Sequence, residues 1–196
     1  MDEHGVVVFG GDGYSTDWHE EATSKRGLEN LRNTSEALHV LQRDDIRDLF
    51  ARHQVISPVE LQSRFAVYAE QYVLAIEVEA RVALSMVRTQ IAPAVEKHVG
   101  SLAHSLRQQS QLGLEPDQRG LLELSDLQRR LQDQCAGLAE CADALPHSDP
   151  AQAMIHCAAS LLPRLEQLRA IVDSLEQQID DDHWPLPSYR EMLFVR

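Results

Sequence analysis

The sequence predicts a mainly all-α protein: a long antiparallel three-helix bundle with short N-terminal helices and one orphan β-strand. Three observations predict this fold. Apolar residues recur at helical spacing along three long stretches of the 196-residue chain. Hydrophobic residues make up 43% of the sequence but aromatic residues only 5%, a balance typical of bundles packed with Leu and Ala. Only one short run of residues favours a strand.

Residues 1–56 are expected to form a strand, a Gly-rich turn and short helices. The run of Val and Phe at residues 6–9 predicts the strand, and the three glycines within residues 10–13 predict a tight turn with positive φ angles. A single strand lacks ladder partners, and residues 192–195 are the one other short candidate. The strand therefore suggests a sheet in a missing N-terminal domain or another subunit, with an ordered loop as the equal alternative.

Short helices should follow this turn. One is expected to begin near Ser15, with Asp17 and Glu20 at capping-box spacing, and to end at Gly27. Another opens at Thr34, and a third covers about residues 44–53.

Residues 57–183 are expected to hold the bundle of long helices. Ser57, Pro58 and Glu60 have the residue types of a helix start, and nothing interrupts the apolar pattern until Gly113. Pro93 should bend or break this rod near residues 89–93. The pattern consists of apolar or aromatic residues at helical spacing: Leu61, Phe65, Tyr68, Tyr72, Ile76, Ala80, Ala83, Val87, Ile91, Val95, Leu102 and Leu106.

Two further helices complete the predicted bundle. After a loop at residues 113–120, leucines spaced by seven mark the second, with Leu127 and Cys141 between them: Leu124, Leu131, Leu138 and Leu145. Asp149 and Pro150 predict the start of the third, in which Pro163 is a candidate kink. Its apolar residues alternate steps of four and three, a pattern typical of coiled-coil packing: Met154, Ala158, Leu161, Leu165, Leu168, Val172, Leu175 and Ile179. Residues 184–196 form a C-terminal aromatic tail that needs a surface to bury against.

Charge and cysteine content exclude several classes of partner. A formal net charge of -13 repels phosphate backbones and anionic lipids, so we expect neither nucleic-acid nor membrane binding. No apolar run reaches the ~20 residues that cross a bilayer, and residues 6–9 are too short for a signal-peptide core. Cys135, Cys141 and Cys157 match no zinc spacing and are expected to be reduced, buried thiols of a cytoplasmic protein.

No catalytic, cofactor-binding or metal residue is assigned from spacing alone. The Gly-rich turn lacks the GxGxxG spacing and the lysine of phosphate loops. His98 and His104 lie on opposite sides of one predicted helix, so they cannot share a metal. The nine histidines include no pair at metal-binding spacing and are expected to be solvated or capping: His4, His19, His39, His53, His98, His104, His147, His156 and His183.

Several stretches, taken in order, resemble the C-terminal region of type III glutamine synthetases. They begin with Val-Phe-Gly-Gly-Asp-Gly-Tyr-Ser-Thr-Asp-Trp and end with Trp-Pro-Leu-Pro-Ser-Tyr-Arg-Glu-Met-Leu-Phe. Gly10 stands where the family usually has Asn, and Gln62 where His is expected. Residues 107–180 match in pattern only. The full set is residues 8–18, 26–31, 34–38, 53–55, 60–65, Tyr72, Ile76, Glu77, 91–94 and 184–194.

The resemblance implies a part of a ligase whose chemistry lies elsewhere. Family members join ammonia to glutamate with ATP, through a γ-glutamyl phosphate, using divalent metals such as Mg²⁺ held by carboxylates of a catalytic domain upstream of this region. No catalytic residue is therefore carried over to this chain, and ATP and Mg²⁺ are not expected in it. The implied partners are that catalytic domain and the other subunits of a homo-oligomer.

Two alternatives stay open at the level of sequence. The chain could be a freestanding helical interaction or scaffold protein without enzymatic activity, or, with little residue support, a sensor that binds a metal or a nucleotide.

Overall fold

The computed structural model describes residues 2–187 and 189–193. Among these residues every regular element is a helix, which confirms the all-α class. The chain divides into two compact units, with the boundary between Tyr68 and Ala69, inside the longest described helix. The elements are η1 (Asp2–Val7), α1 (Thr16–Ser24), α2 (Thr34–His39), η2 (Val40–Gln42), α3 (Asp44–Arg52), α4 (Pro58–Met86), η3 (Val87–Ile91), α5 (Ala92–Gln111), α6 (Arg119–Asp143), α7 (Pro150–His156), η4 (Cys157–Leu161), α8 (Leu162–Glu176) and α9 (Tyr189–Leu193).

The predicted strand at residues 6–9 is wrong in the described chain. The 3₁₀ helix η1 occupies Asp2–Val7, and the amide of Val8 donates to the carbonyl of Gly5 at 3.1 Å. Val6, Val7 and Val8 are all exposed rather than buried between neighbouring strands. The apolar run therefore did not need the missing sheet that its pattern suggested.

Arg26 supplies the hydrogen bonds that a sheet would have supplied. Its Nη1 donates to the carbonyls of Val8 at 2.6 Å and Val6 at 3.3 Å, while Glu21 fixes the guanidinium through an ion pair of 2.6 Å. The rings of Phe9 and Trp18 stack with centroids 4.4 Å apart, and the Arg26 guanidinium lies 5.0 Å from the Trp18 ring centroid. One cation thus anchors the N-terminal segment to α1.

The Gly-rich turn at residues 10–13 does not have the predicted positive φ angles. Positive φ angles among the glycines of the described chain occur at Gly27 (66°) and Gly113 (80°), and not within residues 10–13. A Cβ at Gly11 would lie 2.7 Å from the Phe9 ring, so a side chain there would have to displace that ring. The turn is closed by Asp12, whose side chain accepts from the Tyr14 amide at 3.0 Å. Helix α1 begins near the predicted position, but its cap is Ser15, whose hydroxyl accepts from the Trp18 amide, rather than the predicted capping box of Asp17 and Glu20. The helix ends at Ser24, before the predicted end at Gly27.

The long rod begins as the sequence predicts. Pro58 is the first residue of α4, and the Ser57 hydroxyl accepts from the Glu60 amide at 3.2 Å. The rod continues through η3 and α5 to Gln111, before Gly113. Its buried residues follow the predicted spacing in part, with Ala69, Val73 and Leu84 taking the places expected of Tyr68, Tyr72 and Ala83.

Each internal proline follows a single π-helical turn. The turn Val87–Ile91 precedes Pro93, and the turn Cys157–Leu161 precedes Pro163. At both sites the amide one residue before the proline reaches back five residues, from Ala92 to Val87 and from Leu162 to Cys157. Because proline has no amide proton and crowds the preceding turn, the wider turn lets the helix continue through it.

Helix α6 confirms the predicted leucine spacing. Leu124, Leu131 and Leu138 are buried, with Leu127 and Cys141 also at the core, and Leu145 is buried just beyond the helix end at Asp143. Burying side chains of this size contributes roughly 1.5–3 kcal/mol each relative to leaving them in water. Asp149 caps α7 by accepting from the amides of Ala151 and Gln152, and Pro150 is its first residue.

The predicted seam of the last long helix is only half right. Met154, Leu161, Leu168, Leu175 and Ile179 are buried as expected. Ala158, Leu165 and Val172 are only half-buried, and Cys157 and Ile171 take their places in the core. The buried residues therefore lie on a helix face that is rotated slightly from the predicted face.

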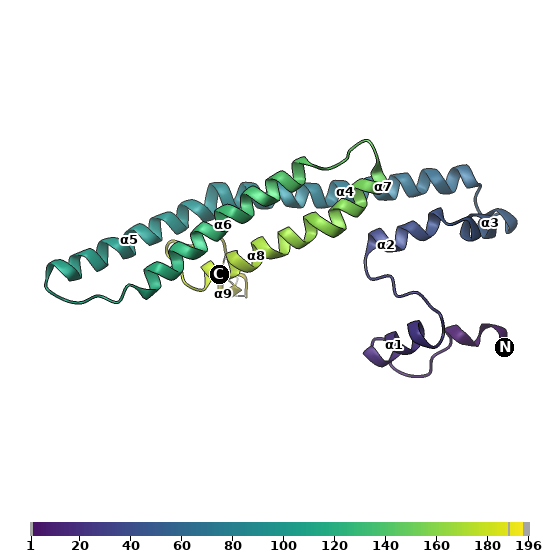
Figure 1. Cartoon of the computed structure of the whole chain (residues 1–196), viewed down its shortest axis with the longest axis horizontal. Helices are drawn as coiled ribbons and strands as arrows, with labels where there is room; N and C mark the ends of the chain where they lie inside the picture. Colours follow the sequence, from purple (N-terminus) through teal and green to yellow (C-terminus); the bar gives the residue numbers. More distant parts are fainter. Residues whose placement is uncertain (1, 188, 194–196) are drawn as a thin grey trace. The chain divides into compact units, whose positions relative to one another are not determined.

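In the second unit the long helices pack along one another. Helix α6 folds back beside α5, and α8 lies along α6 (Figure 1).

Helix α8 ends at Glu176, before the acidic residues 180–182. In the tail, Trp184 buries its indole nitrogen and α9 spans Tyr189–Leu193. Residues 188 and 194–196 lie outside the described chain, and the predicted limits of the linking, bundle and tail segments stay predictions.

Candidate binding cavity and outer helix face

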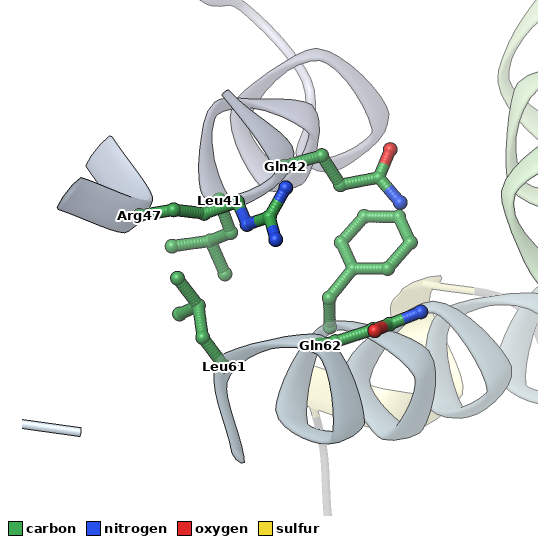
Figure 2. Close-up of a pocket in the computed structure, with 6 residues that line it drawn as sticks. Leu41, Gln42, Arg47, Leu61 and Gln62 are labelled. Atoms are coloured by element: carbon green, nitrogen blue, oxygen red, sulfur yellow. The ribbon is translucent and has the colours of Figure 1, made fainter. Parts of the chain in front are cut away.

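The first unit contains a cavity of about 300 Å³ between η2, α3 and the start of α4. Its apolar walls are Leu41, Leu61 and Phe65, and its polar residues are Gln42, Gln62 and Arg47. Figure 2 shows the Arg47 guanidinium pointing into the space between the η2 turn and α4, with Leu41 and Leu61 facing each other beside it. We call this site the Arg47 cavity.

The walls of the Arg47 cavity are held by contacts outside it. Arg43, at the junction of η2 and α3, forms ion pairs with Glu29 at 2.8 Å and Asp45 at 2.7 Å. Its hydrogen bond lowers the pKa of the Asp45 carboxyl and raises the pKa of the Arg43 guanidinium. On the α4 side, the His39 ring packs edge-on against Phe65, with centroids 5.9 Å apart.

A second cavity, of about 410 Å³, lies along α4, η3 and α8 in the second unit. It includes the half-buried Leu165 and Val172, which the sequence had placed in the core. Its lining is predominantly apolar: Glu79, Ala83, Met86, Val87, Ile91, Leu162, Leu165, Glu166, Leu168, Arg169, Val172 and Leu186. We call it the apolar groove.

Helix α4 has a second apolar face that stays largely exposed within the second unit. Leu74, Val78 and Val82 are spaced by four, so they line one side of the helix, and they are 62%, 52% and 51% exposed. The buried residues Val73, Ile76, Ala80 and Leu84 lie on the opposite side. A helix that is apolar on both sides is normally buried on both. We call Leu74, Val78 and Val82 the outer face of α4.

The three cysteines are free and buried, in agreement with the sequence. Burial raises the pKa of the Cys157 thiol to about 11, with smaller contributions from Glu77 and Cys141. Burial also raises the pKa of Cys135. The Cys141 sulfur lies 3.3 Å from His156 Nε2, and that nitrogen lies 2.9 Å from the Cys141 carbonyl oxygen. The three thiols are packed among core side chains, and Cys141 lies beside the half-buried His156.

The structure pairs histidines that lie far apart in sequence. His98 Nδ1 and His183 Nδ1 are 3.4 Å apart, across 85 residues, whereas His104 contacts Gln108 instead. Within the described residues no group of three or more His, Cys, Asp or Glu side chains could hold a metal ion.

Sequence reasoning missed the Arg47 cavity, the apolar groove and the outer face of α4. Arg47 is one arginine among many charged residues, and no local spacing places it near Leu61 and Phe65. The outer face of α4 could have been found, because Leu74, Val78 and Val82 recur every four residues beside the buried stripe. No helix of the described chain combines the length and hydropathy needed to cross a membrane.

The fold and its surfaces define a helical domain with a packed core, a small cavity and an uncovered apolar face. Residues 1–110 match the family model of the glutamine synthetase C-terminal domain, and the chain belongs to this family. The resemblance to type III glutamine synthetases is thereby confirmed.

Curated relatives extend the likeness over nearly the whole chain. The type-3 glutamine synthetase of Dictyostelium discoideum is 32% identical over 203 residues, covering 99% of this chain and 28% of that protein. The glutamine synthetase of Bacteroides fragilis (strain YCH46) is 28% identical and covers 97% of this chain and 27% of that protein. The glutamine synthetase of Butyrivibrio fibrisolvens is 27% identical and covers 97% of this chain and 28% of that protein. The chain spans a little over a quarter of the length of these relatives.

Proposed function

We propose that this chain is the non-catalytic helical part of a type III glutamine synthetase, and that it packs against the catalytic domain and neighbouring subunits of a homo-oligomer. The activity of the whole enzyme would be ATP-dependent ligation of ammonia to glutamate, with ATP and Mg²⁺ bound outside this chain. A cytoplasmic location is part of the proposal, supported by three free buried thiols.

The outer face of α4 is the observation that carries this proposal. Leu74, Val78 and Val82 leave a continuous aliphatic strip in water, which costs free energy roughly in proportion to its exposed area. Covering that strip with another part of the enzyme would recover this free energy. The apolar groove, lined by Leu165 and Val172, adds a second uncovered apolar surface in the same unit.

The long helices would serve as a rigid support for this face. We propose that the rod of α4 and α5, with α6 and α8, acts as an antiparallel three-helix bundle that holds the strip straight for docking. A rigid support lowers the ordering cost of association, because few side chains and no loops must be fixed when the surfaces meet.

The test is Val78→Asp in the full-length enzyme. We expect smaller assemblies in light scattering and lower ligase activity, because a carboxylate in an apolar contact is left without a partner. The same substitution in this chain alone should leave its thermal unfolding unchanged, since Val78 is exposed here. Gln132→Asp, which adds a charge at an exposed position of α6, is the matched control. Normal assembly of the Val78 variant would contradict the proposal and favour a freestanding scaffold.

A further inference from the structure

We propose that the Arg47 cavity binds a small aliphatic carboxylate that carries a second polar group at its other end. This inference concerns the first unit only and goes beyond the packing role proposed above. It rests on the charge, the shape and the distribution of polar groups in the cavity.

The charge of the cavity is the first argument. Among the described residues that line it, Arg47 alone carries a charge, in a chain whose formal net charge is -13. Its Nη1 donates to Asp44 at 3.2 Å, but the Asp44 side chain is 92% exposed and does not line the cavity. A guanidinium has five N–H donors in a fork that matches a carboxylate. Donors therefore remain for an anion in the cavity.

The shape of the cavity limits the size of the ligand. About 300 Å³ is at the small end of the range for small-molecule sites. Leu61 and Phe65 are buried, so the floor is a fixed apolar surface rather than mobile side chains. A few methylene groups of a ligand can lie on this floor and leave water.

The two glutamines supply the remaining specificity. Gln42 comes from η2 and Gln62 from α4, so both sides of the cavity carry a primary amide. Each amide offers a donor and an acceptor to a second polar group, either a carboxylate or an amide. The three features together select a short chain with a carboxylate at one end and a hydrogen-bonding group at the other.

The test is an NMR titration of the isotope-labelled chain with three probes. Glutarate should shift the amide resonances of residues 41–47 and 61–65 in a saturable way. Glutaramide keeps the methylenes and the polar ends but has no charge, and it should bind at least tenfold more weakly. Pentanoate keeps the carboxylate and the stem without the second polar end, and it should bind with intermediate affinity.

Variants assign the effect to the cavity. Arg47→Gln should weaken glutarate binding at least tenfold, while Arg52→Gln, on the same helix but outside the cavity, should stay within twofold of the parent chain. Gln62→Leu should weaken glutarate binding but leave pentanoate binding unchanged. Arg47, Arg52 and Gln62 are all exposed, so the three variants should fold, and circular dichroism will check this.

Three outcomes would overturn the proposal. The first is no saturable shift with glutarate. The second is an equal loss in the Arg47 and Arg52 variants, or equal competition by sulfate, either of which would indicate nonspecific anion binding. The third is binding to this chain but not to the full-length enzyme, which would mean that an acidic side chain of another polypeptide segment fills the cavity. None of these outcomes depends on whether the outer face of α4 is an assembly surface.

Discussion

Some interactions that the sequence pattern assigned to a whole element are made by a single residue. Arg26 is the clearest case, because its guanidinium binds the carbonyls of Val6 and Val8 that a sheet partner was expected to bind. Gly11 is a second case, since its lack of a side chain makes room for the Phe9 ring. Neither interaction has a periodic signal in the sequence, so neither could be predicted from it.

Cys157 gives the first prediction at this scale. Its thiol has a pKa raised from 9.0 to about 11 by burial, so the folded chain keeps the proton over a range in which the unfolded chain loses it. The contribution of this thiol to the free energy of unfolding is therefore fully present below about pH 9. It is lost as the pH rises towards 11. Allowing for solvent screening, the loss should be on the order of 1–2 kcal/mol.

Urea unfolding between pH 8 and 11 checks this prediction. Cys157→Ala should be less stable than the parent at pH 8, because it leaves a small void, but its stability should fall less steeply as pH rises. Cys141→Ala is the comparison, since Cys141 lies nearby at the edge of the core. Parallel pH profiles for the parent and the Cys157 variant would rule out this thiol as the source of the effect.

At the scale of elements, the helices were predictable where capping and periodicity agree. Ser57 with Pro58, and Asp149 with Pro150, mark helix starts at the observed positions. The strand was wrong because a run of four apolar residues carries too little information to separate a strand from the end of a 3₁₀ helix held by a distant side chain. The prolines were expected to kink or break their helices, and the α-helical pattern is interrupted beside each of them by a single π turn.

The π turn before Pro93 sets the second prediction. Pro93→Ala should change the free energy of unfolding by less than about 1 kcal/mol, because the widened turn already accommodates the missing donor and the ring. Gln71→Pro, at an exposed interior position of α4 without such a turn, should cost about 3 kcal/mol or more. Denaturant midpoints of the two variants measure the difference. A gain approaching 3 kcal/mol in the Pro93 variant would show that the turn is strained.

At the scale of the whole molecule, the core was predictable and the surfaces were not. Leucine spacing identified Leu131, Leu138, Leu161, Leu168 and Leu175 as core residues, and all are buried. The Arg47 cavity joins three elements, so its composition depends on tertiary structure that periodicity does not encode. The absence of site residues in this chain stays a prediction.

The half-correct seam of α8 gives the third prediction. Leu168→Asp should abolish cooperative unfolding, because an unpaired carboxylate in the core costs several kcal/mol, a large part of the stability of a typical domain. Leu165→Asp should remain folded with a modest loss, since Leu165 is half-buried and lines the apolar groove. Thermal melts followed by circular dichroism separate the two. Equal melts would mean that Leu165 belongs to the core after all.

The placement of the two tryptophans has a practical consequence. Trp18 stacks on Phe9 in the first unit, and Trp184 buries its indole nitrogen in the second. Since the chain has no other tryptophan, a Trp18→Phe or Trp184→Phe variant emits from one unit alone. Fluorescence of the two variants in increasing denaturant would then record whether both units melt in a single step or one after the other.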